Sequence, residues 1–502
     1  MNKEKSYTIK ILIAVFVIGF LSINSHSLWM DEAMRIQYSR ITVENGYFDF
    51  CWYFMQVGLV HLLYIWEKLV GGSEAAFRMF NLPFLMIAAV YMLFILKKMK
   101  QSPLWLLLFA IHPLVTYYMN DASPYIPIMA CTCAMMWHCF YTDKINAITN
   151  TAIILFWLTL GYSLHFIFGF AGCLYLCSLV YRWKNGSSLK SLMKDILVII
   201  PFAVLDIYIS LMYLEHMIDG SSRGWEAPGI FNLSSAGYCF IGLAGLGLPR
   251  NAMRMGYYHL ITPTMIGLCG MMVISILILC IQNIRKLLSF FKEPAILANI
   301  IFAIVFLVAA YSRNFQFRER HVIFLYPMFF LFFVVLCHSA WQHKNKWFNR
   351  PWVILFCALL FTSSAQLRFV KEYQKDDCRG AINCVKDNGF LNGHLPVLAQ
   401  GEMFPYHYYN IKVTSAIPSL QPNTVSDINR IDSNNIISIT EELLQKYPAV
   451  CLILTEKEKT SFELYVNAEY AFKTRGYTTE IITEYNTFKV IFVSRPSVIS
   501  YN

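Results

Sequence analysis

Long apolar runs recur along this chain, and they limit its possible folds more than any other feature. About eleven runs approach the 20 or so apolar residues that a helix needs to cross a bilayer, at 8–26, 78–96, 103–119, 124–142, 149–163, 165–181, 194–214, 257–281, 294–311, 321–338 and 351–369. No small-residue cleavage site follows the first run, so we interpret it as an uncleaved span rather than a signal peptide. The sequence therefore predicts a polytopic α-helical membrane protein.

The composition agrees with this class. Only 14% of the residues are charged, whereas a soluble domain carries about 25%. The net charge of +10 is compatible with a nucleic-acid partner. However, cytoplasmic loops of membrane proteins also collect lysine, so we expect no nucleic acid. The 14 cysteines include no C-x-x-C pair, so we expect no metal site built on that spacing.

The distribution of basic residues predicts the topology. With the N-terminus in the cytoplasm, the inner segments hold 17 basic residues, of which 14 are lysine. The outer loops before the tail hold ten, of which nine are arginine. Lysine-rich inner segments are typical topology signals. Arginine is the residue that forks onto phosphate or carboxylate, so the outer set also indicates substrate contacts.

Two domains are predicted, residues 1–370 and 371–502. In the first, we expect outer-face loops at 27–77 and 215–256, with a surface helix at 52–66 and an interfacial or re-entrant segment at 229–248. In the second, apolar patches alternate with helical stretches, which favours a small α/β domain. The patches lie at 397–400, 449–454 and 488–494, and the helical stretches at 438–447 and 456–475. An odd number of spans places this domain outside the cytoplasm.

Charged and polar residues gather on the predicted outer face, each near the end of a span. They are Asp31, Glu32, Arg35, His61, Asp121, His165 and the run YSRNFQFRER at 311–320. Charges are costly in hydrocarbon, so a cavity open to this face is expected to gather them. A carboxylate at a partly desolvated interface can act as a general base. Arginines can orient a phosphate, and an apolar bundle can hold a lipid tail. Together these groups predict transfer from a lipid-linked phosphate donor.

Four motifs in residues 1–370, and one in the tail, carry a resemblance to a known class. HSLWMDEAMR at 26–35 resembles the first-loop motif of the GT-C membrane glycosyltransferases that use polyprenyl-phosphate sugars. These include protein O-mannosyltransferases and the bacterial aminoarabinose transferases that modify lipid A. The other three motifs follow in the family's order, GGSEAAFRM at 71–79, HPLVTYYMNDASPY at 112–125 and RERHVIFLYPMFFLF at 318–332. KDDCRGAINCV at 375–385 is similar to the helix that often opens the family's outer domain.

The resemblance implies roles for particular residues. Asp31 matches the family's catalytic aspartate, Glu32 its neighbour, and Asp121 stands where the family usually has glutamate. Ser123 stands where the family often has arginine, which removes one expected phosphate contact. The substrate-binding candidates are Arg35, His61, Tyr125, His165, Arg318 and Arg320. The implied reaction is an inverting transfer from a polyprenyl-phosphate sugar to lipid A, a surface glycan or protein. No cofactor and no metal are expected.

Other interpretations of the same residues remain open. Asp31 and Asp121 can be explained as helix-cap or first-turn acids, and Glu74 can pair with Arg78 one turn away. At the level of the whole protein, the alternatives are a transporter or flippase and a non-catalytic scaffold. A transporter usually places charges near the midplane, on paired broken spans. The expected location is the cytoplasmic (inner) membrane, with many spans, the N-terminus inside and the C-terminal domain outside.

Overall fold

The computed structural model describes residues 3–44, 56–142, 145–186, 198–211, 213, 263–312, 319–369, 377–401, 403–428, 433–455, 467–485 and 488–496. The chain divides into two compact units. The first, which we call the membrane unit, comprises Met1–Asn24 and Ser39–Tyr373. The second, the α/β unit, comprises Ser25–Tyr38 and Gln374–Asn502, so it takes in the first-loop motif as well as the tail. The predicted boundary at 370/371 falls outside the described residues.

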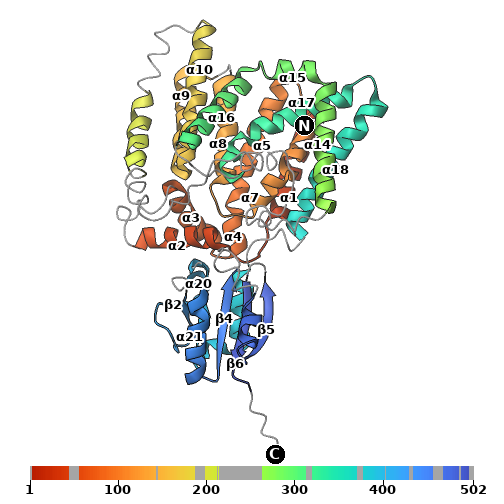
Figure 1. Cartoon of the computed structure of the whole chain (residues 1–502). Helices are drawn as coiled ribbons and strands as arrows, with labels where there is room; N and C mark the ends of the chain where they lie inside the picture. The colour runs from red at the N-terminus through yellow and green to blue at the C-terminus, as the bar shows by residue number, and fades with distance from the viewer. Residues whose placement is uncertain are drawn as a thin grey trace, which may run out of the picture. The chain divides into compact units, whose positions relative to one another are not determined.

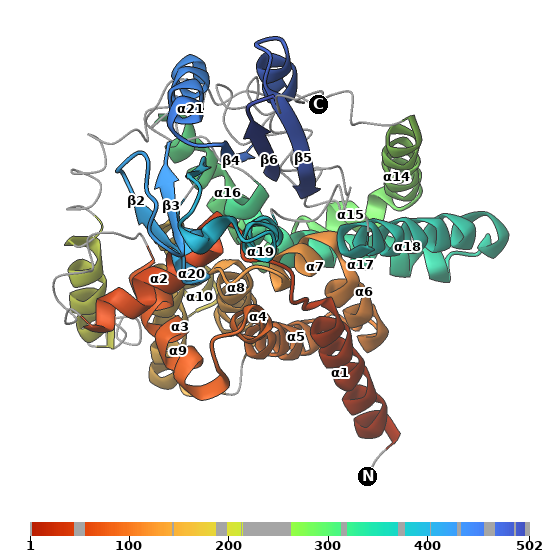
Figure 2. The ribbon, with the colours of Figure 1, turned by 90° about the horizontal axis from the view of Figure 1, so that it is seen from below.

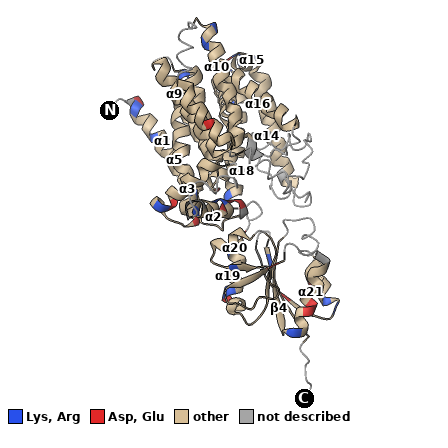
Figure 3. Ribbon diagram, turned by 90° about the vertical axis from the view of Figure 1, so that its left-hand side faces the viewer, with Lys and Arg blue, Asp and Glu red and all other residues tan. Residues whose placement is uncertain are grey.

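The membrane unit is helical (Figure 1). Its long helices have apolar sequences, and their charged residues lie mostly toward the helix ends (Figure 3). Helix α2, Met30–Glu44, begins in the α/β unit and ends in the membrane unit. The remaining labelled helices of the membrane unit are α1 Lys3–Ser22, α3 Val57–Val70, α4 Glu74–Met79, α5 Asn81–Lys98, α6 Leu106–Ile111, α7 Pro113–Met119, α8 Tyr125–Phe140, α9 Ala147–Leu164, α10 Gly172–Lys184, α14 Pro263–Gln282, α15 Ile284–Phe290, α16 Pro294–Ser312, α17 Tyr326–Gln342 and α18 Lys346–Phe369.

These helices confirm a multi-pass membrane protein. Within the described residues, seven helices are long and apolar enough to cross a bilayer, or eight if Ile266–Gln282 and Ile284–Phe290 form one span bent by 85°. Two shorter apolar helices, Tyr125–Phe140 and Val198–Leu211, correspond to two more predicted spans. The total of eleven stays a prediction. The segment predicted as a surface helix at 52–66 forms α3 from Val57 onward, and its position on the membrane surface stays a prediction. The predicted segment at 229–248 lies outside the described residues.

The third predicted span, 103–119, is not one continuous helix. A short 3-10 turn, Pro103–Trp105, leads into α6, and the helix breaks at His112 before α7 begins at Pro113. Proline disfavours the helical conformation of the residue before it, and His112 accordingly has a ψ of 134°. The Leu114 N–H donates to Nδ1 of His112 at 3.2 Å, so the histidine caps the new helix.

The α/β unit confirms the predicted α/β fold of the C-terminal residues. Its six-stranded sheet has the order β2-β3-β1-β4-β6-β5, and Figure 2 shows the labelled strands in this sequence. Strands β2, β3, β1 and β4 are parallel, and β6 pairs antiparallel with both β4 and β5. The strands are β1 Val397–Ala399, β2 Lys412–Thr414, β3 Thr424–Asp427, β4 Ala449–Thr455, β5 Thr478–Tyr485 and β6 Phe488–Ser494. The helices are α19 Cys378–Asp387, α20 Phe404–Tyr408 and α21 Ser433–Lys446.

Strand β4 is buried along its whole length because helices cover both faces of the sheet. Cys451 and Ile453 pack with Ile382 of α19 on one face. Leu452 and its neighbours pack on the other face with α21 and with the helical segment 467–473. The predicted apolar patches are confirmed as β1, β4 and β6, and the predicted helix at 438–447 as α21.

Candidate active site

The first-loop motif forms the start of α2. The Trp29 carbonyl accepts hydrogen bonds from the backbone N–H groups of Glu32 at 3.1 Å and Ala33 at 3.0 Å, so Trp29 is the N-cap residue. The Glu32 carboxylate reaches back and accepts from the Trp29 N–H at 3.4 Å. This is the second half of a capping box, with Glu32 at the third helical position. Glu32 is fully buried, and its side chain helps to begin the helix.

Asp31 lies in the first turn of α2 but is not its N-cap. Its Oδ2 is 3.8 Å from Nη2 of Arg35, one turn further along the helix. The Arg35 side chain is 3% exposed and that of Asp31 is 14% exposed. Asp31 is therefore the more accessible of the two motif acids, and it lies next to a buried positive charge.

The residues just before α2 are bound by the tail. The backbone N–H of Arg379 donates to Oγ of Ser27 at 3.0 Å, and the Leu28 N–H donates to the Tyr409 hydroxyl at 3.0 Å. The Arg379 guanidinium also donates to the carbonyl of Ser25 at 2.8 Å. All these residues belong to the α/β unit. The first-loop motif HSLWMDEAMR and the motif KDDCRGAINCV are therefore joined by a direct hydrogen bond between residues 352 positions apart in the chain.

The second predicted acid, Asp121, lies in the membrane unit, in the turn between α7 and α8. It is fully buried. Asn81, the first residue of α5, donates to the Asp121 carbonyl at 2.7 Å and to the Tyr118 carbonyl at 3.0 Å, which fixes this turn. Helix α8 begins after Pro124 with no side-chain cap, so Asp121 does not cap it. The hydroxyl of Ser123 is buried and has no hydrogen-bond partner among the described residues.

Tyr125 and His165 are brought together by α8 and α9. Their ring centroids are 6.1 Å apart, and the two residues are 2% and 5% exposed. His165 follows the end of α9 with φ −161° and ψ 124°, and it accepts from the Ile167 N–H at 3.3 Å. It therefore caps the short 3-10 helix Phe166–Ala171. His165 repeats at this break what His112 does between α6 and α7.

The three remaining predicted substrate-binding residues are His61, Arg318 and Arg320. His61 lies on α3, where its Nδ1 is 2.7 Å from the Val57 carbonyl of the same helix. Arg318 lies outside the described residues. Arg320 belongs to the 3-10 segment Glu319–Leu325, and its side chain is also outside the described part of the chain.

Sequence reasoning did not predict a buried polar bridge in the membrane unit. Arg78, 1% exposed, donates from Nη1 to Oδ1 of Asn24 at 2.8 Å and to its carbonyl at 3.2 Å. The Asn24 N–H in turn donates to Oδ1 of Asn120 at 2.8 Å. The bridge connects the end of α4 with the turn that carries Asp121. The signal available in the sequence is the arginine of GGSEAAFRM, for which the local spacing suggests Glu74 as a partner.

Among the residues that the structure describes, no three His, Cys, Asp or Glu side chains come together as a possible metal site. The expectation of a metal-free and cofactor-free reaction stays a prediction.

The chain has a helical membrane unit and a small mixed sheet, and its fold matches the GT-C fold. The chain is similar to the crystal structure of ArnT from Cupriavidus metallidurans in the apo state, with a TM-score of 0.53, 10% sequence identity and 98% of each chain covered. ArnT from the same organism bound to undecaprenyl phosphate matches with a TM-score of 0.49 and 10% identity, over 97% of this chain and 98% of that one. No family model and no curated protein sequence matches. What is shared at this identity is the fold.

Proposed function

We propose that this protein is a glycosyltransferase that moves a sugar from a polyprenyl-phosphate donor to an acceptor on the outer face of the cytoplasmic membrane. One observation carries the proposal. The partly exposed Asp31 lies in the first turn of α2 beside the buried Arg35, in a chain whose GT-C fold extends over 98% of its length. ArnT is a lipid A aminoarabinose transferase. Lipid A, a surface glycan and a protein hydroxyl are all candidate acceptors here.

Asp31 acts as the general base in this reaction. The acceptor hydroxyl oxygen attacks the anomeric carbon of the sugar, and its proton passes to the Asp31 carboxylate. The bond between the anomeric carbon and the phosphate oxygen breaks, and the lipid phosphate leaves as an anion. Attack opposite to the leaving group inverts the anomeric configuration. General base catalysis of this kind contributes about 100-fold to 10,000-fold in rate.

The exposure of the three acids supports Asp31 rather than its neighbours. The Asp31 side chain is 14% exposed, whereas Glu32 and Asp121 are fully buried. A base must come within hydrogen-bonding distance of the acceptor hydroxyl, so an accessible carboxylate has the advantage. The Arg35 guanidinium lies beside this carboxylate, with its Nη2 3.8 Å from Oδ2 of Asp31.

The polar residues of the membrane unit contact the substrate in this proposal. Asp121, Tyr125 and His165 lie where α7, α8 and α9 begin or end. Non-helical backbone at membrane depth is tolerated where protein buries it or where it lines a cavity. Arg318 and Arg320 stabilise the charge that develops on the departing phosphate. The reaction requires no cofactor beyond the lipid-linked donor.

The test uses the full-length protein in sealed vesicles with a radiolabelled polyprenyl-phosphate sugar and candidate acceptors. Covalently labelled acceptor is the expected product, and Asp31→Asn removes it. Asp387→Asn is the matched control, because Asp387 lies exposed at the end of α19 in the same unit. Uptake of label without any covalent product would instead identify a transporter. Wild-type turnover by Asp31→Asn would reject Asp31 as the base.

A further inference from the structure

The tail of the chain contacts α2 on both sides of Asp31. Before the helix, Ser27 and Leu28 are hydrogen-bonded to Arg379 and Tyr409. Further along α2, the ring of Tyr38 lies 5.5 Å from that of Phe404, between centroids. Phe404 is the first residue of α20, and Tyr409 directly follows its last. One short helix and its C-cap residue therefore reach α2 both before and after the acid.

We infer that Tyr409 and Arg379 are positioning residues, which fix Asp31 in its reactive place by holding the segment that leads into α2. The inference rests on the proposed function. It assigns the tail a part in the reaction, although neither residue contacts the reacting atoms in this account.

The Tyr409 hydroxyl makes the contact nearest to the acid. It accepts the Leu28 N–H at 3.0 Å and lies 3.3 Å from Oγ of Ser27. Leu28 immediately precedes Trp29, the N-cap residue of α2. From Trp29 onward, the hydrogen bonds of the first turn determine where Asp31 lies. A shift of Leu28 therefore moves Asp31, because only the rigid helix start separates them.

Ser27 also completes the start of α19. The first N–H groups of a helix have no partner within the helix. In α19, the Asp377 carboxylate accepts the N–H of Gly380 at 2.9 Å. The N–H of Arg379, one residue earlier, is accepted by Ser27 instead. The loop before Asp31 is thus part of the capping of α19, and the two segments are held in one fixed arrangement.

Such an arrangement matters to a general base because proton transfer depends steeply on distance. A displacement of 1 Å in a reacting group can cost about 100-fold in rate. Tyr409→Phe removes one oxygen and keeps the ring, so α2 remains but its start is less restrained. We expect kcat to fall about tenfold, with KM for the donor unchanged. Arg379→Ala should have a smaller effect, because its backbone N–H still binds Ser27.

The experiment compares Tyr409→Phe, Ser27→Ala and their double variant in the labelled-sugar assay, with Tyr447→Phe as a control. Tyr447 is a half-buried tyrosine of the same unit that packs on the α21 face of the sheet. Because Tyr409 and Ser27 share a contact, their effects should be less than additive. The pH dependence of kcat is recorded for each variant, since a displaced base alters that profile whereas general destabilisation lowers only the amount of active protein.

A loss of kcat at constant KM, seen in both single variants and absent in Tyr447→Phe, supports the inference. Wild-type kcat in Tyr409→Phe and Ser27→Ala overturns it while leaving the proposed function intact. A similar loss of activity in Tyr409→Phe, Ser27→Ala and Tyr447→Phe, in proportion to the loss of folded protein, also overturns it. If the wild-type protein transfers no sugar, the proposed function fails, and the positioning role fails with it.

Discussion

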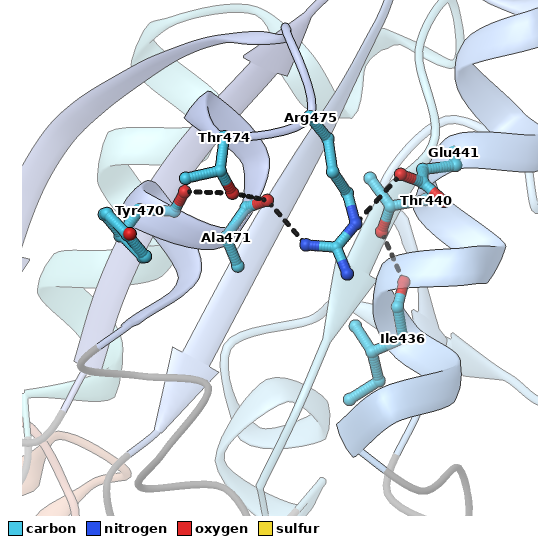
Figure 4. A network of polar contacts seen from close by, with 7 residues as sticks. All are labelled: Ile436, Thr440, Glu441, Tyr470, Ala471, Thr474 and Arg475. Carbon is cyan, nitrogen blue, oxygen red and sulfur yellow. Dashed lines mark hydrogen bonds and ion pairs between the residues drawn. The ribbon is translucent and has the colours of Figure 1, made fainter.

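The membrane unit and the α/β unit differ in where their polar side chains lie. In the membrane unit they lie at helix breaks, where His112, His165 and Asn81 bind backbone groups that the helices leave unpaired. In the α/β unit, buried Glu32 and Ser27 also bind N–H groups at helix starts. Around the buried, mostly apolar strand β4, however, further polar contacts lie near the surface. One such network joins Arg475 to Glu441 of α21 and to the Ala471 carbonyl (Figure 4).

This difference bears on the two candidate acids. Asp121 belongs to the membrane unit, where it is fully buried in a turn that Asn81 holds. Asp31 belongs to the α/β unit, where it keeps part of its surface and lies beside Arg35. Asp31 and Asp121 both belong to motifs that resemble the same family, but their environments differ. The buried acid is suited to shaping a site, and the accessible one to exchanging a proton.

The largest expected effect is the loss of activity in Asp31→Asn, and its absence would contradict the different roles given to the two acids. Asp31→Asn should lower kcat by at least about 100-fold, since it removes the proton acceptor. Glu32→Gln keeps an oxygen that can accept the Trp29 N–H, so the decrease in kcat should be much smaller in this variant. Steady-state kinetics with the labelled donor measures both. Equal losses in the two variants would contradict the separate roles that we assign to the neighbouring acids.

The next effect concerns the apolar core of the α/β unit. Leu452→Ala, in the buried strand β4, should lower the free energy of unfolding by about 2–5 kcal/mol, because it removes buried methyl groups and leaves a cavity. Val204→Ala is the comparison in the membrane unit, where Val204 is 63% exposed on an apolar helix. It should change stability little. Denaturant titration of the full-length protein, with unfolding of each unit detected by proteolysis, distinguishes the effects of the two substitutions.

A smaller effect tests the buried turn of the membrane unit. Asn81→Leu should destabilise the protein by about 1–3 kcal/mol, because it removes the hydrogen bonds that Asn81 donates to the carbonyls of Asp121 and Tyr118. Asn383→Leu, at an exposed position on α19, is the control. The thermal midpoint in detergent reports both. No difference between the two variants would show that Asn81 does not hold the turn that carries Asp121.

The smallest effect lies in the surface network of Figure 4. The Nε of Arg475 is 3.3 Å from Oε1 of Glu441, and the two side chains are 46% and 32% exposed. Solvent screens such a pair, so Arg475→Gln should cost less than about 1 kcal/mol. A loss as large as that of Leu452→Ala would mean that surface polar contacts, rather than the apolar core, stabilise this unit.

The sequence predicts the features that depend on neighbouring residues. Apolar runs predicted the membrane class, and alternating patches predicted the strands β1, β4 and β6. The break before Pro113 also follows from proline stereochemistry, which the prediction of one continuous span at 103–119 overlooks.

Features that depend on distant residues could not be predicted in this way. Ser25–Tyr38 belongs to the same unit as the C-terminal residues because of contacts such as the hydrogen bond between Ser27 and Arg379. No local sequence pattern encodes such a contact. The same holds for the bond between Arg78 and Asn24, which lie 54 residues apart in the chain.

The most direct test of the account is the anomeric configuration of the product. Full-length protein is supplied with a polyprenyl-phosphate sugar carrying ¹³C at the anomeric carbon, and the labelled acceptor is isolated and its configuration read by NMR. We predict an inverted configuration with the wild-type protein and no labelled product with Asp31→Asn. A retained configuration, or labelled acceptor formed at the wild-type rate by Asp31→Asn, would contradict a single displacement with Asp31 as its base.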